Sequence, residues 1–383
     1  MRIVDVCAFY APEGGGVRTY IERKLKAAPA AGHELIVLAP GRTSRVEQRG
    51  PMARIEWLAS PRFPLDRRYG YFADAAALHA ALDRLAPDVV EVSSPWRSAS
   101  MVADWRGDAR RVLVMHADPL SAYAYRWFGG VADRATIDRG FGWFWRHLRR
   151  LDTRYDAVVS ASASLSQRLT EGGLRRVITN PMGVDPGIFS PGLRDAGLRA
   201  RLLERCALQE SATLLLAVGR HAPEKRWPMV IDAAMAAGAR RAVGLVLVGD
   251  GRARARIMRQ TGANPHVCLL SPIRDRTALA TLMASADALI HGCEAETFCI
   301  VAAEAHASGL PLIAPDSGGA ADQAVAHGGL TYRAGSSASA ARAITRFVDH
   351  PQRPTGAVRT MDAHFDELFA LYGWLDQPAA RAA

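Results

Sequence analysis

The strongest constraint on the fold is an alternation, repeated along most of the chain, of short apolar runs with segments of helical periodicity. The runs RIVDVCAF (2–9), HELIVLAPG (33–41) and TLLLAVG (213–219) are apolar over most of their length, which is typical of strands buried on both faces of a sheet. After the first run, Val17, Ile21 and Leu25 recur at helical spacing. The alternation predicts an α/β fold with parallel sheets covered by helices.

The length of 383 residues exceeds what a single hydrophobic core usually organises, so we expect two domains. The first spans 1–185, and a connector rich in Gly, Pro and charge follows over 186–211. The second spans 212–352 and repeats the order at the start of the chain: a strand, a loop with Ala-Pro-Glu and a helix. An amphipathic helix is expected over 353–378, and a disordered tail over 379–383.

The net charge of +10 either reflects an Arg-rich composition or indicates an anionic partner. Such a partner could be nucleic acid, an anionic lipid surface or an anionic substrate such as a sugar nucleotide. The sequence has no zinc-finger spacing, no RNA-binding aromatic motif and no dimeric basic helix, so no nucleic-acid partner is expected.

Other features of the composition bear on the compartment. No apolar stretch is long enough to span a bilayer, and the first residues are typical of a strand rather than a signal peptide. The five cysteines are scattered and odd in number, which indicates neither a disulfide framework nor a metal knuckle. We therefore expect a cytoplasmic protein.

The segment from Glu294 to Gly319 is the most informative for function. A helix is expected to begin between Phe298 and Ile300 and to end near Ser308, with Glu296 in the loop before it and Glu304 on it. Free N–H groups at the start of a helix suit a phosphate, and carboxylates beside them can take hydroxyls of a sugar or ribose. The apolar run and the glycine turn that follow complete one unit of a nucleotide-binding α/β domain.

This segment resembles the signature of retaining glycosyltransferases of family four, which have the GT-B fold. The residues that match are Glu296, Phe298, Glu304, Ala305, Gly309, Pro311 and Ile313. Cys299 departs from the pattern, because the family usually has glycine there. The resemblance implies two Rossmann-like domains that face each other across a cleft, with the C-terminal helix crossing back to the first domain. The donor, a nucleotide-diphosphate sugar with UDP or GDP unresolved, would bind mostly to the second domain and the acceptor to the first.

The segment VGRHAPEK (218–225) resembles the part of the family that binds the donor diphosphate. Arg220 and Lys225 would supply the two cations that stabilise the leaving group. His116, Arg220, Lys225 and Glu296 are the expected catalytic residues. Further donor contacts are expected from Gly15, Gly16, Gly219, Gly249, Asp250, Thr297, Phe298, Cys299, Ile300 and Glu304. The alternative is that these residues have no role in binding or catalysis: the charged side chains are solvated and the glycines form ordinary turns.

On the acceptor side, His116 lies just past an expected strand, where ligands of α/β proteins bind. His116, Asp118 and Tyr123 resemble a family segment that faces the donor sugar, and Asn180 and Gly183 resemble an architectural stretch. Two segments, 60–72 and 138–155, interleave aromatic residues with arginines, among them Arg67 and Arg68. They predict either peripheral membrane contact by the first domain or an aromatic core under a solvated basic face.

The sequence lacks the motifs of several other enzyme classes. No Gly-x-Gly-x-x-Gly is followed by an acid at the right distance, and neither a nucleophile elbow nor a His-Glu-x-x-His is present. The resemblance implies transfer of a hexose to a hydroxyl of a lipid or glycan with retention and without a metal or other cofactor. Two alternatives stay open: another GT-B activity, such as a nucleotide-sugar epimerase or a phosphorylase, and a basic membrane- or polymer-binding protein with a degenerate site.

Overall fold

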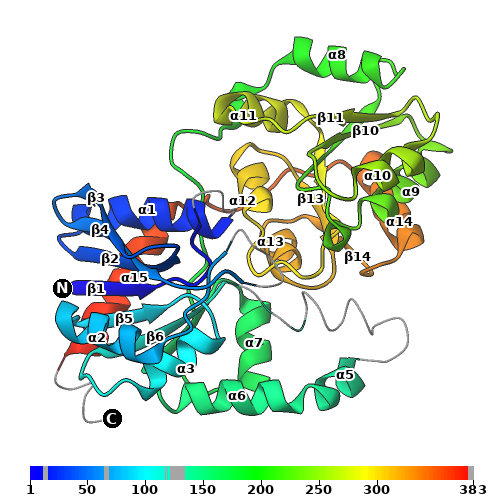
Figure 1. Ribbon diagram of the computed structural model, residues 1–383. Helices are drawn as coiled ribbons and strands as arrows, with labels where there is room; N and C mark the ends of the chain where they lie inside the picture. The colour runs from blue at the N-terminus through cyan, green and yellow to red at the C-terminus, as the bar shows by residue number, and fades with distance from the viewer. Residues whose placement is uncertain (12–15, 64–68, 117, 119, 121–133, 378–383) are drawn as a thin grey trace. The chain divides into compact units, whose positions relative to one another are not determined.

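The computed structural model describes residues 1–11, 16–63, 69–116, 118, 120 and 134–377. These residues form two compact units, each built around its own sheet (Figure 1). The first unit contains the described residues up to Asp118, those from 134 to Pro181 and those from Asp362 to 377. The second unit contains Leu120 and Met182–Met361.

The sheet of the first unit has eight strands. Their order across the sheet is β3 (Arg45–Gly50), β4 (Ala53–Ala59), β2 (Glu34–Gly41), β1 (Arg2–Val6), β5 (Val89–Val92), β6 (Arg110–Met115), β7 (Ala157–Ser160) and β8 (Val177–Thr179). Neighbouring strands are parallel, as expected, except that β3 pairs antiparallel with β4 at the edge. The polar and largely exposed sequence of β3 suits an edge strand, because polar side chains discourage pairing with another chain.

The first unit also contains seven helices among its described residues. They are α1 (Gly16–Ala30), α2 (Ala75–Leu85), α3 (Arg97–Asp104), α5 (Arg134–Gly140), α6 (Gly142–Asp152), α7 (Ala163–Glu171) and α15 (Met361–Asp376). The start of α2 is set by Asp74, whose Oδ1 accepts from the backbone N–H groups of Ala76 and Ala77 at 2.9 and 3.1 Å. A side-chain acceptor at this position satisfies donors that the helix leaves unpaired.

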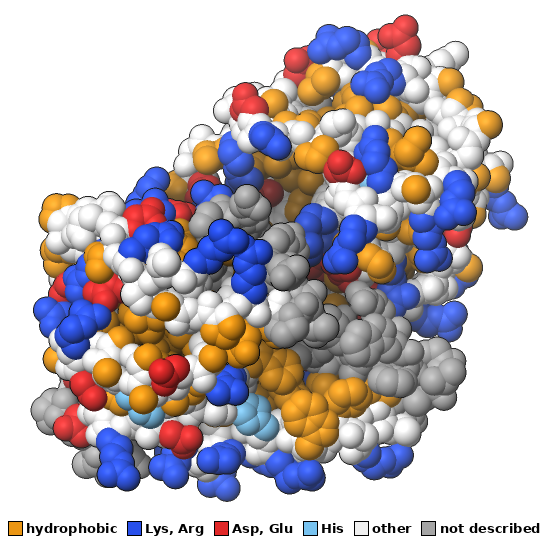
Figure 2. Space-filling model, in the orientation of Figure 1, with side chains coloured by type: hydrophobic (Ala, Val, Ile, Leu, Met, Phe, Trp, Pro, Cys, Tyr) orange, Lys and Arg blue, Asp and Glu red, His pale blue; other side chains and the backbone are white. Residues whose placement is uncertain are grey.

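Helix α6 divides its aromatic residues between core and surface. Phe144, Trp145 and Leu148 are buried, so much of the segment that interleaves aromatics with arginines is core. Trp143 is 51% exposed, and Arg146 and Arg150, one and two turns further along the same face, are exposed as well. Basic side chains recur along the edge of the first unit that α6 forms (Figure 2).

The C-terminal helix α15 packs in the first unit, which confirms that the chain crosses back (Figure 1). It begins at Met361 rather than at 353, and Pro354 and Gly356 lie in the non-helical stretch before it. The Tyr372 hydroxyl donates to the carboxylate of Glu91 on β5, and the ring of Phe369 lies 5.2 Å from that of His33.

The sheet of the second unit has six strands, all parallel. Their order is β11 (Val267–Leu270), β10 (Val243–Val248), β9 (Thr213–Val218), β12 (Ala288–Ile290), β13 (Leu312–Pro315) and β14 (Leu330–Tyr332). In chain order this is 3-2-1-4-5-6, the doubly wound arrangement that binds nucleotides where the strand order reverses. That reversal lies between β9 and β12.

Two buried cores cover the faces of this sheet. One is built with α8 (Ala196–Arg205), α11 (Arg276–Ser285), α12 (Ile300–Ala307) and α13 (Gly319–Ala326), and the other with α9 (Trp227–Gly238), α10 (Arg254–Thr261) and α14 (Ser337–Asp349). The 3-10 helices η2 (Pro191–Leu193) and η3 (Pro223–Lys225) complete the unit. The expected helix near Phe298 to Ser308 is α12.

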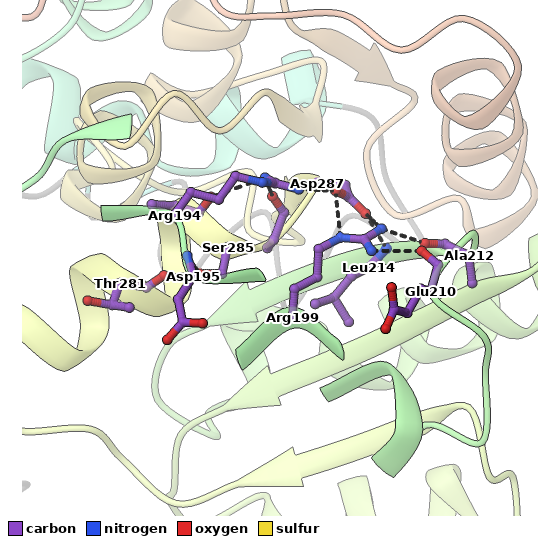
Figure 3. Close-up of polar contacts among 11 residues, drawn as sticks. Arg194, Asp195, Arg199, Glu210, Ala212, Leu214, Thr281, Ser285 and Asp287 are labelled. Atoms are coloured by element: carbon purple, nitrogen blue, oxygen red, sulfur yellow. Dashed lines mark hydrogen bonds and ion pairs between the residues drawn. The ribbon is translucent and has the colours of Figure 1, made fainter. Parts of the chain in front are cut away.

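The stretch 186–211, expected as a connector, is an integral part of the second unit (Figure 3). Its Arg199 forms an ion pair with Asp287 at 2.7 Å and donates to the carbonyls of Glu210 and Ala212 at 2.8 Å each. Arg194 reaches the other oxygen of Asp287 at 3.2 Å. Its Gly, Pro and charged residues therefore mark caps and ion pairs rather than a linker.

The described helices include none with the length and the apolar character needed to cross a membrane.

Candidate active site

The site is built where the strand order of the second unit reverses. Gly219 and Arg220 follow the carboxyl end of β9, and His291 follows the carboxyl end of β12. Loops that leave two neighbouring parallel strands in opposite directions open a crevice between them, and ligands of doubly wound sheets bind there.

Two glycine loops meet backbone to backbone at one side of this crevice. A Cβ on Gly249 would lie 2.0 Å from the carbonyl oxygen of Gly219, and a Cβ on Gly251 would lie 2.6 Å from that of His221. The N–H of His221 donates to the carbonyl of Asp250 at 2.7 Å. These glycines are therefore required for packing, and the Asp250 side chain stays exposed.

Lys225 and Glu296 are brought together from the two sides of the crevice. The Lys225 ammonium forms an ion pair with Oε1 of Glu296, and Nε2 of His291 lies 3.2 Å from the same oxygen. The Lys225 and Glu296 side chains are only 16% and 21% exposed. Burial alone would raise the pKa of Glu296, but Lys225 and His291 outweigh it and hold that pKa well below its usual range. Glu296 is therefore a carboxylate at neutral pH.

A second ion pair beside the first joins residues that the sequence did not single out. Arg226 binds the carboxylate of Glu294 with two nitrogens, one of them Nε at 2.7 Å from Oε2. The sequence offers one weak indication of this second pair. Arg226 directly follows Lys225, and Glu294 lies two residues before Glu296, so the two basic and the two acidic residues occur in the same domain. His291 was missed because a histidine in a loop carries no periodicity.

The start of α12 is fixed by residues before and after it. Cys299 caps the helix with φ of 72°, a left-handed conformation that a glycine adopts more easily. The side chain of Gln323 donates to the carbonyls of Phe298 and Cys299. A Cβ on Gly318 would lie 2.5 Å from the carbonyl oxygen of Glu294, so this turn also requires glycine. Thr297 and Ile300, expected donor contacts, are half-buried beside it.

Glu304 and Arg220 each contact a neighbouring charged side chain. The Glu304 carboxylate is buried and accepts from Nη2 of Arg276 on α11 at 2.8 Å. The Arg220 side chain is 74% exposed and lies 3.3 Å from Glu224. Its backbone is fixed, because Trp227 Nε1 donates to its carbonyl at 2.9 Å. The site as described gathers Lys225 and Glu296 and leaves Arg220 extended into solvent.

In the first unit, His116 directly follows β6, as expected. Its ring contacts Tyr20 edge-on, with 4.8 Å between centroids. Burial lowers the pKa of His116 to about 4, so the imidazole is neutral at physiological pH. Asp118 forms an ion pair with Arg168 at 2.9 Å. Gly16 is exposed at the start of α1, and Gly15, Arg67, Arg68 and Tyr123 lie outside the described residues.

The described residues also include one group that could hold a metal ion. One ligand atom each from His291, Glu296 and Cys299 lies within 4.8 Å of the others. Neither the histidine and carboxylate spacing nor the scattered cysteines indicated this group in the sequence. The expectation that the reaction needs no metal stays a prediction.

The Lys225–Glu296 pair lies at the switch point of a doubly wound sheet, which is where such sheets bind nucleotides, and comparisons with known proteins specify the class. Residues 14–187 match the family described as Glycosyltransferase Family 4, and residues 201–359 match Glycosyl transferases group 1. The GDP-mannose-dependent alpha-mannosyltransferase of Mycobacterium tuberculosis (strain CDC 1551 / Oshkosh) is 32% identical over 333 residues, which are 85% of this chain and 82% of that relative. The GDP-mannose-dependent alpha-(1-6)-phosphatidylinositol dimannoside mannosyltransferase of M. tuberculosis (strain ATCC 25177 / H37Ra) is 31% identical over 343 residues, 85% of this chain and 86% of the relative.

Solved structures agree on the fold. The sucrose-phosphate synthase of Thermosynechococcus elongatus matches with a TM-score of 0.68 and 20% identity over 98% of this chain and 95% of that one. HepE of Anabaena in complex with UDP and glucose matches with a TM-score of 0.63 and 18% identity over 100% of this chain and 99% of that one.

The chain belongs to glycosyltransferase family 4 and has the GT-B fold. It is a glycosyltransferase that takes its sugar from a nucleotide-sugar donor. The comparisons do not favour the alternatives of an epimerase or of a binding protein with a degenerate site.

Proposed function

We propose that the protein transfers a mannosyl group from GDP-mannose to a hydroxyl of a mannosylated phosphatidylinositol-type lipid, with retention of configuration and without a metal ion. The observation that carries the catalytic part is the Lys225–Glu296 pair at the switch point of the second unit. The donor and the acceptor are proposed from relatives named for GDP-mannose and for phosphatidylinositol dimannoside.

Lys225 stabilises the leaving group in this proposal. Breaking the bond between the anomeric carbon and the diphosphate oxygen places negative charge on the diphosphate, and a preorganised cation is most effective when it faces that developing charge. Ion pairing with Glu296 raises the pKa of Lys225 against the opposing effect of burial, so the ammonium stays charged. Arg220, extended into solvent, adds a flexible guanidinium that binds the diphosphate as the donor arrives. The first N–H groups of α12 face the same anion.

Glu296 orients the sugar. Its carboxylate, held in the charged form, accepts a hydrogen bond from a hydroxyl of the donor sugar. Arg276 holds the Glu304 carboxylate on α12. In this proposal the same carboxylate accepts hydrogen bonds from the ribose hydroxyls. The acceptor hydroxyl attacks the anomeric carbon on the face that the diphosphate leaves, and the departing phosphate takes its proton. The protein then needs no separate carboxylate base, unlike a hydrolase with paired acids.

The acceptor binds to the first unit in this proposal. The neutral imidazole of His116 hydrogen-bonds a sugar hydroxyl, and Arg168 holds the Asp118 carboxylate. The exposed face of α6, with Trp143, Arg146 and Arg150, contacts the membrane that carries the lipid. Trp at the headgroup boundary and Arg against anionic lipid make such a contact favourable.

The test combines binding and transfer. The melting temperature is measured with GDP-mannose, UDP-glucose and ADP-glucose, because a ligand of the native state stabilises it. Transfer from radiolabelled GDP-mannose is then measured to phosphatidylinositol mannosides and to a soluble mannoside. Stabilisation by GDP-mannose and label in the lipid product support the proposal. Stabilisation by another donor only would overturn GDP-mannose as the donor. Label in the soluble acceptor only would overturn the lipid as the acceptor.

The metal requirement is tested separately on the same reaction. Excess EDTA should leave the transfer rate within about twofold, because a diphosphate held by Lys225, Arg220 and α12 needs no bridging Mg²⁺. A complete loss that Mg²⁺ or Mn²⁺ restores would contradict metal independence.

A further inference from the structure

We propose that His291, Glu296 and Cys299 form a binding site for one soft divalent cation of the Zn²⁺ type, and that the bound ion blocks the donor site by taking Glu296 away from Lys225. Binding of the ion follows from the side chains alone. Blocking of the donor rests on the function proposed above.

The two distances from the His291 nitrogen to the other ligand atoms suit tetrahedral zinc. Nε2 of His291 lies 3.2 Å from Oε1 of Glu296 and 3.7 Å from Sγ of Cys299, and the three atoms lie within 4.8 Å of one another. With Zn–N and Zn–O near 2.0–2.1 Å and Zn–S near 2.3 Å, a tetrahedral ion holds N and O roughly 3.3 Å apart and N and S roughly 3.5 Å apart. Nε2 of His291 is therefore already close to its tetrahedral separations, whereas the Glu296 oxygen and Sγ of Cys299 would have to approach to roughly 3.5 Å from a separation of up to 4.8 Å.

The backbone of all three residues is held before any ion arrives. The Tyr332 hydroxyl donates to the carbonyl of His291, and Gly319 N–H donates to that of Glu296 at 2.7 Å. Gln323 fixes the carbonyl of Cys299 at 3.1 Å. Cys299 has a φ of 72°, a left-handed conformation that glycine adopts more easily, so the backbone here does not require a thiol side chain.

The ligand types select the metal. Imidazole and thiolate favour Zn²⁺ and similar soft ions, whereas Mg²⁺ prefers oxygen ligands only. On binding, the Cys299 thiol gives its proton to the solvent and a Zn–S bond forms. His291 contributes the lone pair of a neutral imidazole, and Glu296 contributes a carboxylate oxygen. One thiolate and one carboxylate balance the two charges of the ion, and solvent can complete the tetrahedron beside the partly exposed Glu296.

Lys225 competes with the ion for Glu296, and this competition is why metal binding would affect the donor site. Its ammonium contacts the same Oε1 that the ion would take, and two cations at one oxygen repel each other. The long, flexible side chain of Lys225 can move into solvent, whereas the three ligands are attached to fixed backbone. The bound ion therefore removes Lys225 from the place where it would stabilise the donor diphosphate.

The site is tested on the tag-free full-length protein by titration with Co²⁺, which absorbs characteristically when a thiolate binds it, and by competition for Zn²⁺ with a chromophoric chelator. We expect one cobalt–thiolate site per chain. Cys299→Ala, which keeps the same left-handed backbone requirement, should abolish the thiolate band and weaken zinc binding by at least about tenfold. If the alanine variant does not fold, Cys299→Gly replaces it, because glycine adopts the left-handed conformation at this position without strain. Cys268→Ala, a buried cysteine on β11, is the matched control and should keep the band.

Lys225→Met supplies a test of opposite sign. Removing the competing ammonium should tighten zinc binding by about tenfold or more, whereas a loss of general fold would weaken it. A thiolate band that persists in Cys299→Ala and Cys299→Gly, or no cobalt–thiolate band in the wild type, overturns the site. If the protein binds Zn²⁺ but shows no cobalt–thiolate band, the zinc is bound by other groups, such as the stacked His306 and His327. That result also counts against the proposed site.

The blocking step is measured as GDP binding by calorimetry with and without saturating Zn²⁺. We expect zinc to weaken GDP binding to the wild type and to leave Cys299→Ala unaffected. Zinc that binds through Cys299 and leaves GDP affinity unchanged would overturn the blocking step and leave the metal site standing. Because the readout is binding, the result does not depend on which acceptor the enzyme uses.

Discussion

Each unit has a cluster of largely buried, paired charges. In the first unit, Asp5 on β1 and Glu91 on β5 are direct neighbours in the sheet, and the fully buried Lys24 of α1 forms ion pairs with both. Glu91 also accepts from Tyr372 of α15. One cation between two carboxylates leaves an excess negative charge in a dry core, and the pKa of Glu91 reflects it.

This cluster gives a prediction about stability and pH. Burial and then Asp5 raise the pKa of Glu91 to about 7, against the lowering effect of Lys24. The folded state therefore keeps a proton that the unfolded state releases, and stability should fall as pH rises from the ordinary carboxyl range to about 7. Glu91→Gln is neutral at every pH, so its melting temperature should fall less than that of the wild type between about pH 5 and pH 8. The exposed Glu171→Gln is the control, and equal slopes for Glu91→Gln and wild type would contradict the prediction.

In the second unit, the residue-scale prediction concerns the leaving group. Lys225→Ala and Arg220→Ala should each lower the transfer rate by about a hundredfold, as removal of one preorganised donor to a developing anion does. The measurement is the initial rate at saturating donor, with folding checked by circular dichroism. Arg241→Ala, which removes an exposed arginine paired with Asp349, should keep the rate. Near wild-type rates in both Lys225→Ala and Arg220→Ala would exclude the clamp.

At the scale of elements, the sequence determines the strands well because buried parallel strands are continuously apolar, and α12 begins and ends within the expected bounds. It determines connections less well. The stretch 186–211 is rich in Gly, Pro and Arg, yet Arg199 and Asp287 join residues 88 positions apart, and no local pattern records such a pair. For the same reason Glu296, Lys225 and Cys299 are recognised separately in the sequence, but only the structure shows that they lie together and that His291 lies beside them.

Helix α6 carries the element-scale prediction. Its exposed face should bind anionic membranes through Trp143, Arg146 and Arg150, with each arginine contributing about 1 kcal/mol. Binding is measured by sedimentation with anionic and with neutral vesicles at low and high salt. Arg146→Ser combined with Arg150→Ser should weaken binding to anionic vesicles by up to about thirtyfold, less if the Asp104 contact of Arg150 already shields it.

The matched control for this helix is Trp374→Ala on α15, because Trp374 is 57% exposed but lies on another element. It should leave vesicle binding unchanged, whereas Trp143→Ala should weaken it. Equal and negligible sedimentation with both kinds of vesicle at low salt would count against membrane contact and favour a soluble acceptor.

At the scale of the whole molecule, two of the points where the chain passes between its units are Pro181–Met182 and Met361–Asp362. The two chain segments that make these passages are hydrogen-bonded to each other, once in the first unit and once in the second. In the first unit, Asn180 Nδ2 donates to the carbonyl of His364 at 3.1 Å. In the second, the Val184 N–H donates to the carbonyl of Arg359 at 3.0 Å. The architectural role expected for Asn180 and Gly183 is thus to join these two passages.

Gly183 is the residue on which this junction depends most. A Cβ there would lie 2.2 Å from the carbonyl carbon and 2.3 Å from the oxygen of Thr360, and backbone atoms cannot move aside as a side chain can. We expect Gly183→Ala to separate the two passages and to lower the free energy of unfolding by about 1–3 kcal/mol, as overpacking does. Urea unfolding followed by fluorescence measures it. Gly373→Ala in α15, where a Cβ meets nothing within 4 Å, should be neutral or stabilising. If Gly183→Ala is as stable as Gly373→Ala, the two passages are not packed as tightly as the structure describes.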